Sequence, residues 1–171
     1  LTAINALTTG DVTLTVSDTS QTASSLNSLD ASSTETVNAS AIATLTGAAA
    51  DINTAYASAG ITGLGDEAVT LTDTSVAAST LNTLNANTTG TVDASTVTTI
   101  TGSVADANTM YATAGISGGG DEAVTISDTT VAASDLNTLD GYTTGAIDAS
   151  TLKTITGSGS DAQTAFESAG I

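Results

Sequence analysis

The stretch that decides the fold runs from Gly65 to Gly119 and reads GDEAVTLTDTSVAASTLNTLNANTTGTVDASTVTTITGSVADANTMYATAGISGG. This block recurs on both sides without insertion or deletion. Positions that keep the same kind of residue in successive blocks include Asp18, Asp73 and Asp128; Leu26, Leu81 and Leu136; Gly47, Gly102 and Gly157; and Tyr56, Tyr111 and Phe166. An uninterrupted register predicts that every copy follows the same backbone path, as stacked repeats require.

The register divides the chain into a partial coil at 1–9, repeat 1 at 10–64, repeat 2 at 65–119 and an incomplete repeat 3 at 120–171. Inside the block, Leu1–Gly10 matches Leu81–Gly90, which indicates two related coils per block. Counted from strand to strand, a short coil runs from Val69 to Val92 and a longer one from Val92 to Val124. Both lengths lie near the ~20–29 residues of leucine-rich repeats. The predicted fold is one continuous α/β solenoid of strand–helix coils with a parallel sheet along one face.

The first coil of the block begins with a strand after the glycine-rich turn. Val69 and Leu71 alternate with threonines, which is the period of a half-buried strand. We expect a helix over Val76–Asn85, with Val76, Leu81 and Leu84 facing inward. Stacked coils would align these strands as a parallel sheet.

The second coil is predicted to contain a short strand at Thr91–Ser95, a brief turn at 97–100 and a second helix. Ser103 and Asp106 have a spacing like that of a capping box in front of this helix. Its expected apolar face consists of Ala107, Met110, Tyr111 and Ala114. Gly115 follows at the position of a left-handed C-terminal cap.

The composition is strongly acidic, with 18 acidic residues, one basic residue (Lys153) and a net charge of −17. Nucleic acid is an excluded partner because phosphate binding needs clustered Lys and Arg. An anionic membrane surface is disfavoured for the same reason. No apolar run approaches the ~18 residues of a membrane span, so we expect no membrane insertion. The chain starts and stops within the pattern, which indicates a segment of a longer protein.

Catalytic residues are not expected, and we predict that the protein is not an enzyme. The chain has no His and no Cys, and its abundant Ser and Thr would need a base to act as nucleophiles. Lys153 occurs in one copy of three, as a surface variation would. Paired carboxylates such as Asp66 with Glu67 could act as acid and base, but the pair recurs as Asp121 with Glu122. A complete active site repeated along a rod is unusual.

Calcium is an alternative ligand for the turn Gly65-Asp66-Glu67-Ala68. Two carboxylates and flexible backbone carbonyls suit a hard cation. The spacing matches neither an EF-hand loop nor the glycine-rich nonapeptide repeat, so no metal-ligand residues are assigned and only weak calcium binding is allowed. The three aspartates of the first coil have a simpler interpretation as strand-to-helix caps; they are Asp18, Asp73 and Asp128.

Two further surface functions remain alternatives. Asn38-Ala-Ser40 and Asn87-Thr-Thr89 match the acceptor pattern for N-linked glycans, but the pattern does not recur in every block. Rows of outward threonines such as Thr70 and Thr72 could order water for ice binding. The alternate coil presents Asp93 and Ser95 there, which interrupts the row.

Several phrases recur in fixed order: VTLTDTSVAASTLNTL at 69–84, VDASTVTTITG at 92–102, ADINTAYASAGITGLGDEAVT at 50–70 and VAASDLNTLDGYTTG at 131–145. They resemble the repeats of very large bacterial surface proteins, most of all those of cyanobacteria and related aquatic bacteria. The resemblance covers nearly the whole chain and implies an extracellular, structural, adhesive or filament-forming role. Repeat 1 departs most, with Gln21-Thr22 in place of Val76-Ala77 and Glu35 in place of Gly90.

The sequence therefore predicts an extracellular or cell-surface structural repeat segment that forms a rod, spacer or filament. Its expected partner is itself, head to tail or within a longer repeat chain, because open heterologous ends continue instead of closing. The alternative is a calcium- or glycan-binding adhesion module, and ice binding is a more distant one.

Overall fold

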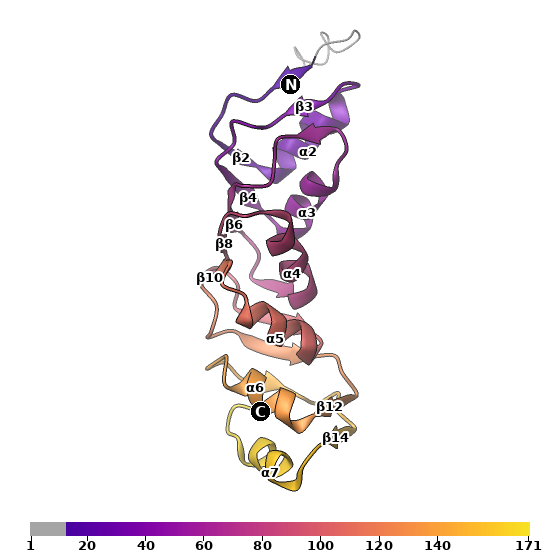
Figure 1. Ribbon diagram of the computed structural model, residues 1–171, viewed down its shortest axis with the longest axis vertical. Coiled ribbons are helices and arrows are strands. Elements are labelled where there is room, and N and C mark those ends of the chain that lie inside the picture. The colour runs from indigo at the N-terminus through magenta and orange to yellow at the C-terminus, as the bar shows by residue number, and fades with distance from the viewer. Residues whose placement is uncertain (1–12) are drawn as a thin grey trace. The chain divides into compact units, whose positions relative to one another are not determined.

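A computed structural model describes residues 13–171 of the chain, and Figure 1 shows its helices and strands. The expected partial coil at 1–9 lies outside the described residues. The chain divides into two compact units, one made of 13–72 with Leu84–Asp93 and the other of Asp73–Thr83 with Ala94–Ile171. Both contain helices and parallel strands, which confirms the predicted α/β class.

The first unit contains two sets of parallel strands. One set is β1 (Leu14–Thr15), β3 (Val37–Asn38) and β5 (Ile61–Thr62), paired in that order. The other is β2 (Ser20–Thr22), β4 (Thr44–Gly47), β6 (Ala68–Leu71) and β8 (Val92–Asp93). Leu45 pairs with Val69, and Val69 pairs with Val92, so each strand pairs with the strand one coil further along the chain.

The second unit repeats this arrangement. Its four-stranded set is β7 (Ser75–Ala77), β9 (Thr99–Gly102), β11 (Ala123–Ile126) and β13 (Ile147–Asp148). A two-stranded set consists of β12 (Thr130–Ala132) and β14 (Thr154–Thr156), and β10 covers Ile116–Ser117. Ile100 of β9 pairs with Val76 on one side and with Val124 on the other, at equal separations along the chain.

These registers correct the predicted long coil. In repeat 1 the equivalent step would place Val37 beside Val69, but Val37 pairs with Ile61 and Val69 pairs with Leu45. Both of these steps have nearly the length of the short coil. The extra residues before the glycine-rich turn form a further short strand, β5, so the strand step stays nearly constant. This step is the physical unit of the sheet, although the repeat of the sequence is longer.

Each coil contains one helix: α2 (Ala23–Ser32), α3 (Ala49–Ala57), α4 (Ala78–Asn87), α5 (Val104–Ala112), α6 (Ala133–Asp140) and α7 (Gly159–Glu167). The helix predicted at Val76–Asn85 begins later, at Ala78, because Val76 lies in β7 and pairs with Ile100. Val76, Leu81 and Leu84 are all buried, as predicted. The predicted turn at 97–100 is wrong in part, since Ile100 lies in β9, where strand neighbours on both sides supply hydrogen bonds.

The second helix of the block begins as predicted and ends differently. The Ser103 hydroxyl accepts the Asp106 N–H at 3.0 Å, which confirms the cap, and Ala107 and Met110 are buried. The helix stops at Ala112, so Ala114 lies beyond it and is exposed.

Gly115 does not have the positive φ of a left-handed cap. Its equivalents Gly60 and Gly170 show another reason for glycine at this position. A β-carbon there would collide with the carboxylate of Asp30 or Asp140, which reaches over from the preceding coil. At Gly60 and Gly170 the missing side chain leaves room for this carboxylate, so glycine there allows close approach between coils without a special backbone angle.

Asparagines connect successive helices. The Asn27 side-chain amide donates to the Asp51 carbonyl at 2.9 Å, and Asn82 and Asn137 make the same bond to Asp106 and Asp161, each at 3.0 Å. These bonds add a side-chain donor to a first-turn carbonyl of the next helix, while leucine, valine, isoleucine and alanine fill the core. Among residues 13–171, no helix has both the length and the apolar character needed to cross a membrane.

Candidate functional site

The glycine-rich turn between β5 and β6 is the most distinctive polar feature of the repeat. Gly63 and Gly65 have φ values of 83° and 135°, and Gly118 and Gly120 have 82° and 125° in the next copy. A β-carbon on Gly63 would come within 2.8 Å of Ser40, so both the backbone angle and the close packing require glycine. The turn delivers the residue that follows it, Glu67, to the start of β6.

Glu67 is buried, with 1% of its surface exposed, and it points into the coil. The Tyr56 hydroxyl donates to its Oε2 atom at 2.9 Å. The Gly65 N–H also donates to the carboxylate, at 3.0 Å from Oε1 and 2.9 Å from Oε2. The carboxylate is thus held by neutral donors at the centre of the turn, an arrangement we call the tyrosine–glutamate lock.

The same lock forms in the next repeat around Glu122, which is also 1% exposed. The Tyr111 hydroxyl donates to its Oε2 at 3.0 Å, and the Gly120 N–H donates to the same atom at 2.7 Å. Buried carboxylates are costly unless hydrogen bonds replace the water they lose. Two copies with the same donors indicate a built feature of the repeat.

The coil that follows clamps the backbone of the lock. The buried Thr88 hydroxyl donates to the Glu67 carbonyl at 2.8 Å and accepts the Gly90 N–H at 3.0 Å. Thr143 and Gly145 make the equivalent bonds around Glu122, at 2.7 and 2.9 Å. A β-carbon at Gly90 or Gly145 would collide with that carbonyl. The Thr-Thr-Gly sequences at 88–90 and 143–145 therefore hold the preceding glycine-rich turn in place through hydrogen bonds to its backbone.

The electrostatics of the lock keep the hydroxyl protonated. Burial, the largest cause, raises the pKa of Tyr56 above its ordinary value of 10. The hydrogen bond with Thr88 lowers this pKa in part, and the hydrogen bond and the charge of Glu67 raise it again. Burial likewise raises the pKa of Tyr111, and the charge of Glu122 adds to the effect. The tyrosine hydroxyl therefore keeps its proton at neutral pH and is the donor in both locks.

A small cavity of about 90 Å³ lies beside the second lock, lined by Met110, Tyr111, Ile116 and Glu122 among others. Ligand pockets are several times larger, at ~300–1,000 Å³. The cavity has room for a few water molecules next to the carboxylate, and not for an organic substrate. The lock is a structural polar core with limited access.

The turn does not present Asp66 and Glu67 as a pair of surface carboxylates. Asp66 is exposed, whereas both oxygens of Glu67 face inward to Gly65 and Tyr56. Asp121 and Glu122 divide in the same way. Across residues 13–171, the structure brings together no group of three or more His, Cys, Asp or Glu side chains that could hold a metal ion.

Two of the three aspartates expected to cap the helix that follows them have other partners. Asp128 accepts the N–H of Val104 at 2.8 Å, so it caps α5 of the preceding coil. Asp18 instead accepts a hydrogen bond from Gln21 at 3.1 Å. Asp128 therefore caps a helix, as predicted, but it caps α5 and not the helix that follows it. The strand β12 lies between Asp128 and that following helix, α6.

The other singled-out residues lie apart from the lock. Lys153 is exposed beside β14. Asn87 is exposed and donates to Asn53 at 3.3 Å, whereas Asn38 is half-buried in β3 and accepts the Ser40 N–H at 3.0 Å. Neither of these two bonds involves Lys153 or a buried carboxylate.

Sequence reasoning missed the lock, although two signals point to it. Glu67 shares the inward parity of Val69 and Leu71, so the alternation that predicted the strand also predicts burial of the glutamate. Tyrosine and glutamate also occur together at the same spacing in two repeats, as Tyr56 with Glu67 and Tyr111 with Glu122. The positions 55 residues before Tyr56 and Glu67 hold Leu1 and Val12, so this pair of partners is absent there.

In comparisons with known proteins, no family model matches the chain, and no curated protein and no solved structure matches it.

Proposed function

We propose that the chain is an extracellular structural repeat segment, in which the strand–helix coils continue as a solenoid to form a rod, spacer or filament of a giant surface or matrix protein. The supporting observation is that the bonds between coils recur at the spacing of the repeat. Asn27 to Asp51, Asn82 to Asp106 and Asn137 to Asp161 are the same bond in three successive repeats. Adding a repeat therefore requires no new kind of contact.

The polar core fits a structural role better than a catalytic one. Glu67 and Glu122 are both 1% exposed and accept hydrogen bonds from tyrosine hydroxyls and backbone N–H groups, and the cavity beside Glu122 is smaller than a substrate pocket. The lock fixes the turn that changes the chain direction between coils. A net charge of −17 keeps such a surface hydrated and opposes non-specific association.

The extracellular placement rests on the resemblance to bacterial surface repeats, and the absence of Cys is compatible with it. Protease treatment of intact cells that produce the protein checks this part of the proposal. Cleavage without lysis supports surface exposure. Protection until lysis contradicts it.

The structural role is tested by lengthening the chain. One, two or three further copies of residues 65–119 are inserted in register, and the radius of gyration is measured by small-angle X-ray scattering. A solenoid predicts that the radius grows in proportion to the number of copies. A compact globule would instead grow as about the 0.38 power of chain length. In a matched control, a Gly/Ser linker of equal length replaces each inserted copy and adds only flexible reach.

Electron microscopy of native material gives an independent measurement. Strand spacing sets a rise of ~10 Å per two coils on the sheet side, whereas helices packed ~8–10 Å apart set about 16–20 Å on the helix side. A filament with a periodicity in this range supports the proposal. Calcium titration by calorimetry, with and without chelator, tests the adhesion-module alternative, which predicts heat and a higher melting temperature.

A further inference from the structure

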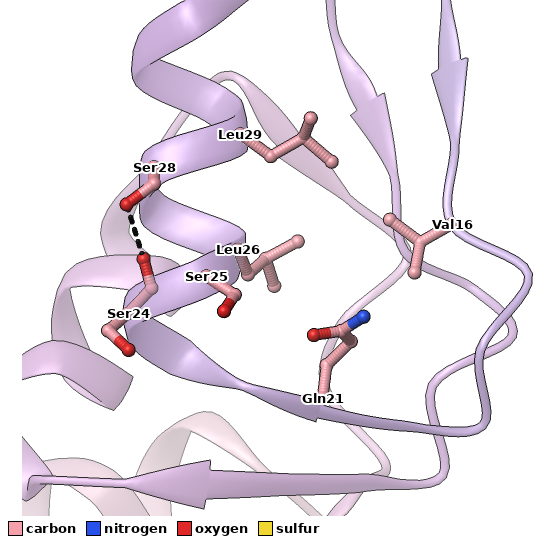
Figure 2. Close-up of a pocket in the computed structure, with 7 residues that line it drawn as sticks. All are labelled: Val16, Gln21, Ser24, Ser25, Leu26, Ser28 and Leu29. Atoms are coloured by element: carbon pink, nitrogen blue, oxygen red, sulfur yellow. Dashed lines mark hydrogen bonds between the residues drawn. The ribbon is translucent and has the colours of Figure 1, made fainter. Parts of the chain in front are cut away.

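The cavity beside the second lock differs from the hollows at the two ends of the described residues because it contains a buried charge. The N-terminal hollow is lined by uncharged side chains, and Figure 2 shows Leu26 and Leu29 of α2 directed toward Val16 across it. The hollow at the other end contains Lys153, which is exposed. The cavity beside the lock instead borders Glu122, whose side chain is 1% exposed. A buried carboxylate is costly unless its partners replace water, so every partner of Glu122 matters.

The two oxygens of the Glu122 carboxylate differ in their partners. Oε2 accepts both hydrogen bonds of the lock, from the Tyr111 hydroxyl at 3.0 Å and from the Gly120 N–H at 2.7 Å. Within residues 13–171, no donor forms a hydrogen bond to Oε1. In the first lock, by contrast, the Gly65 nitrogen lies 3.0 Å from Oε1 and 2.9 Å from Oε2 of Glu67. The second lock therefore leaves one carboxylate oxygen for a partner that the described residues do not supply.

A glycine opens the space next to this oxygen. A β-carbon on Gly119 would lie 3.0 Å from Oε1 of Glu122 and 3.7 Å from Cε1 of Tyr111, so both atoms border the same gap. The position 55 residues earlier, in front of the first lock, holds Leu64, which is half-buried. Gly119 does not have a positive φ, so its backbone does not require glycine. The exchange of leucine for glycine leaves room beside Oε1 in the second lock.

The charge at this cavity is negative and has no positive partner in the lock. Both donors to Oε2 are neutral, since burial and the charge of Glu122 raise the pKa of Tyr111 and keep its proton in place. The neighbouring Asp121 is exposed, and the chain has 18 acidic residues against one basic residue. Such a surface raises the local concentration of cations. A water molecule beside Oε1 would donate a hydrogen bond, but it would leave the buried charge uncompensated.

We propose that the cavity beside Glu122 binds one small monovalent cation, a sodium, potassium or ammonium ion, against Oε1. Its volume of about 90 Å³ has room for such an ion with about two water molecules. One carboxylate balances a single positive charge, whereas calcium takes about 6–8 oxygen ligands. The peptide groups of Gly118 and Gly119, which also line the cavity, and water complete the surroundings of the ion. The inference is independent of the proposed structural function, because it concerns a single lock.

Thermal melting at constant ionic strength tests the site. Tetramethylammonium chloride is the reference salt, because its four methyl groups keep its charge away from Oε1 and are too bulky for this cavity. It is replaced in steps by sodium, potassium or ammonium chloride. At a cation concentration about ten times the dissociation constant, binding should favour folding about tenfold and raise the melting temperature by about 3–6 °C. We expect this rise, with saturation, for at least one of these ions.

Gly119→Leu is the most specific variant, since it introduces the side chain that the preceding repeat carries and leaves Glu122 in place. It should fold and lose the cation-dependent rise in melting temperature. Glu122→Gln removes the charge and should also lose the rise. Asp66→Asn is the matched control, because it makes the same change in net charge at an exposed carboxylate of the first turn, and it should keep the rise. The difference between two salts is compared within each variant, so an altered stability of the variant itself does not affect the result.

An equal rise in the natural chain and in Gly119→Leu would overturn the inference, because the salt would then act on the whole chain and not at the cavity. A melting temperature that is the same in all the monovalent salts would also overturn it, because water alone would then fill the cavity. A larger rise with calcium chloride at the same ionic strength would contradict the monovalent charge of the ion. None of these results changes the outcome expected for lengthened chains, which tests the proposed function separately.

Discussion

The helices α5 and α7 occupy the same position in successive repeats but differ in burial. Val104, Ala107 and Met110 of α5 are buried, whereas Ala165 is the one buried residue of α7. Both helices begin with a serine cap. The apolar pattern of a coil therefore fixes which face can be buried, and the next coil decides whether it is. Stability in this protein is a property of the contact between coils.

The largest effect should come from Ile100→Ala compared with Ile155→Ala. Ile100 is 1% exposed between two strands, whereas Ile155 is half-exposed at the equivalent position one repeat later. Removing the buried side chain leaves a cavity and should lower the free energy of unfolding by about 2–4 kcal/mol. The end position should lose about 1 kcal/mol. Urea denaturation of dilute protein measures the free energy of unfolding of both variants. Equal losses would show that the next coil, which pairs with β9 through β11, does not determine the contribution of Ile100.

The next effect concerns the tyrosine–glutamate lock. Tyr111→Phe removes the hydroxyl that donates to Glu122 at 3.0 Å and should cost about 1.5–2 kcal/mol, because a buried carboxylate loses a donor. Tyr142→Phe is the control. Tyr142 stacks on Tyr111 with ring centroids 5.8 Å apart, and it is 39% exposed. The control should change stability by less than about 0.5 kcal/mol. A similar loss in both variants would show that the effect does not come from the hydrogen bond to Glu122.

How far the sequence predicts this structure depends on the range of each interaction. Val69, Leu71, Leu81 and Leu84 were assigned to the core correctly, because helix and strand periods are local patterns. The strand β7 was missed since so short a segment shows no period, and its ladder comes from β9, one coil further along the chain. Register between distant segments is not a local property.

The candidate site shows the same limit. A glutamate next to a glycine turn has the local character of a surface residue. Its burial is made favourable by the Gly65 N–H of the turn together with the hydroxyl of Tyr56, which comes from the helix before the turn. Asp128 was predicted as a cap on chemical grounds, which the structure confirms, but its partner Val104 belongs to another coil. The kind of interaction that Asp128 makes could be predicted from the sequence. The partner of each residue could not, because Val104 and Tyr56 come close to Asp128 and Glu67 only in the folded chain.

A smaller effect is expected at the helix caps. The Ser103 hydroxyl accepts the Asp106 N–H at 3.0 Å, whereas Ala48 at the same position of α3 makes no side-chain bond. Ser103→Ala should lower the free energy of unfolding by about 1 kcal/mol, and Ala48→Ser should raise it by a similar or smaller amount. Thermal melting of the two variants and of the double variant measures both. The two substitutions should change the free energy of unfolding in opposite directions. A loss of stability in Ala48→Ser would show that positions 48 and 103 are not equivalent helix caps.

The smallest effect is a decline in stability in mild alkali. Burial raises the pKa of Tyr56 and Tyr111 in the folded chain above the value of 10 for an exposed tyrosine. The contribution of these raised pKa values to the free energy of unfolding is complete below pH 10, because the folded and the unfolded chain are then both protonated. It is lost as the pH rises from 10 toward the raised pKa of the folded chain, because the unfolded chain ionises first. Just below pH 10 the effect is slight, since few unfolded tyrosines have lost their proton. Tyr111→Phe removes one of the two groups and should flatten the decline above pH 9 in urea titrations. Tyr56→Phe removes the other group and should also flatten the decline, and an unchanged decline in both variants would show that it does not come from the lock.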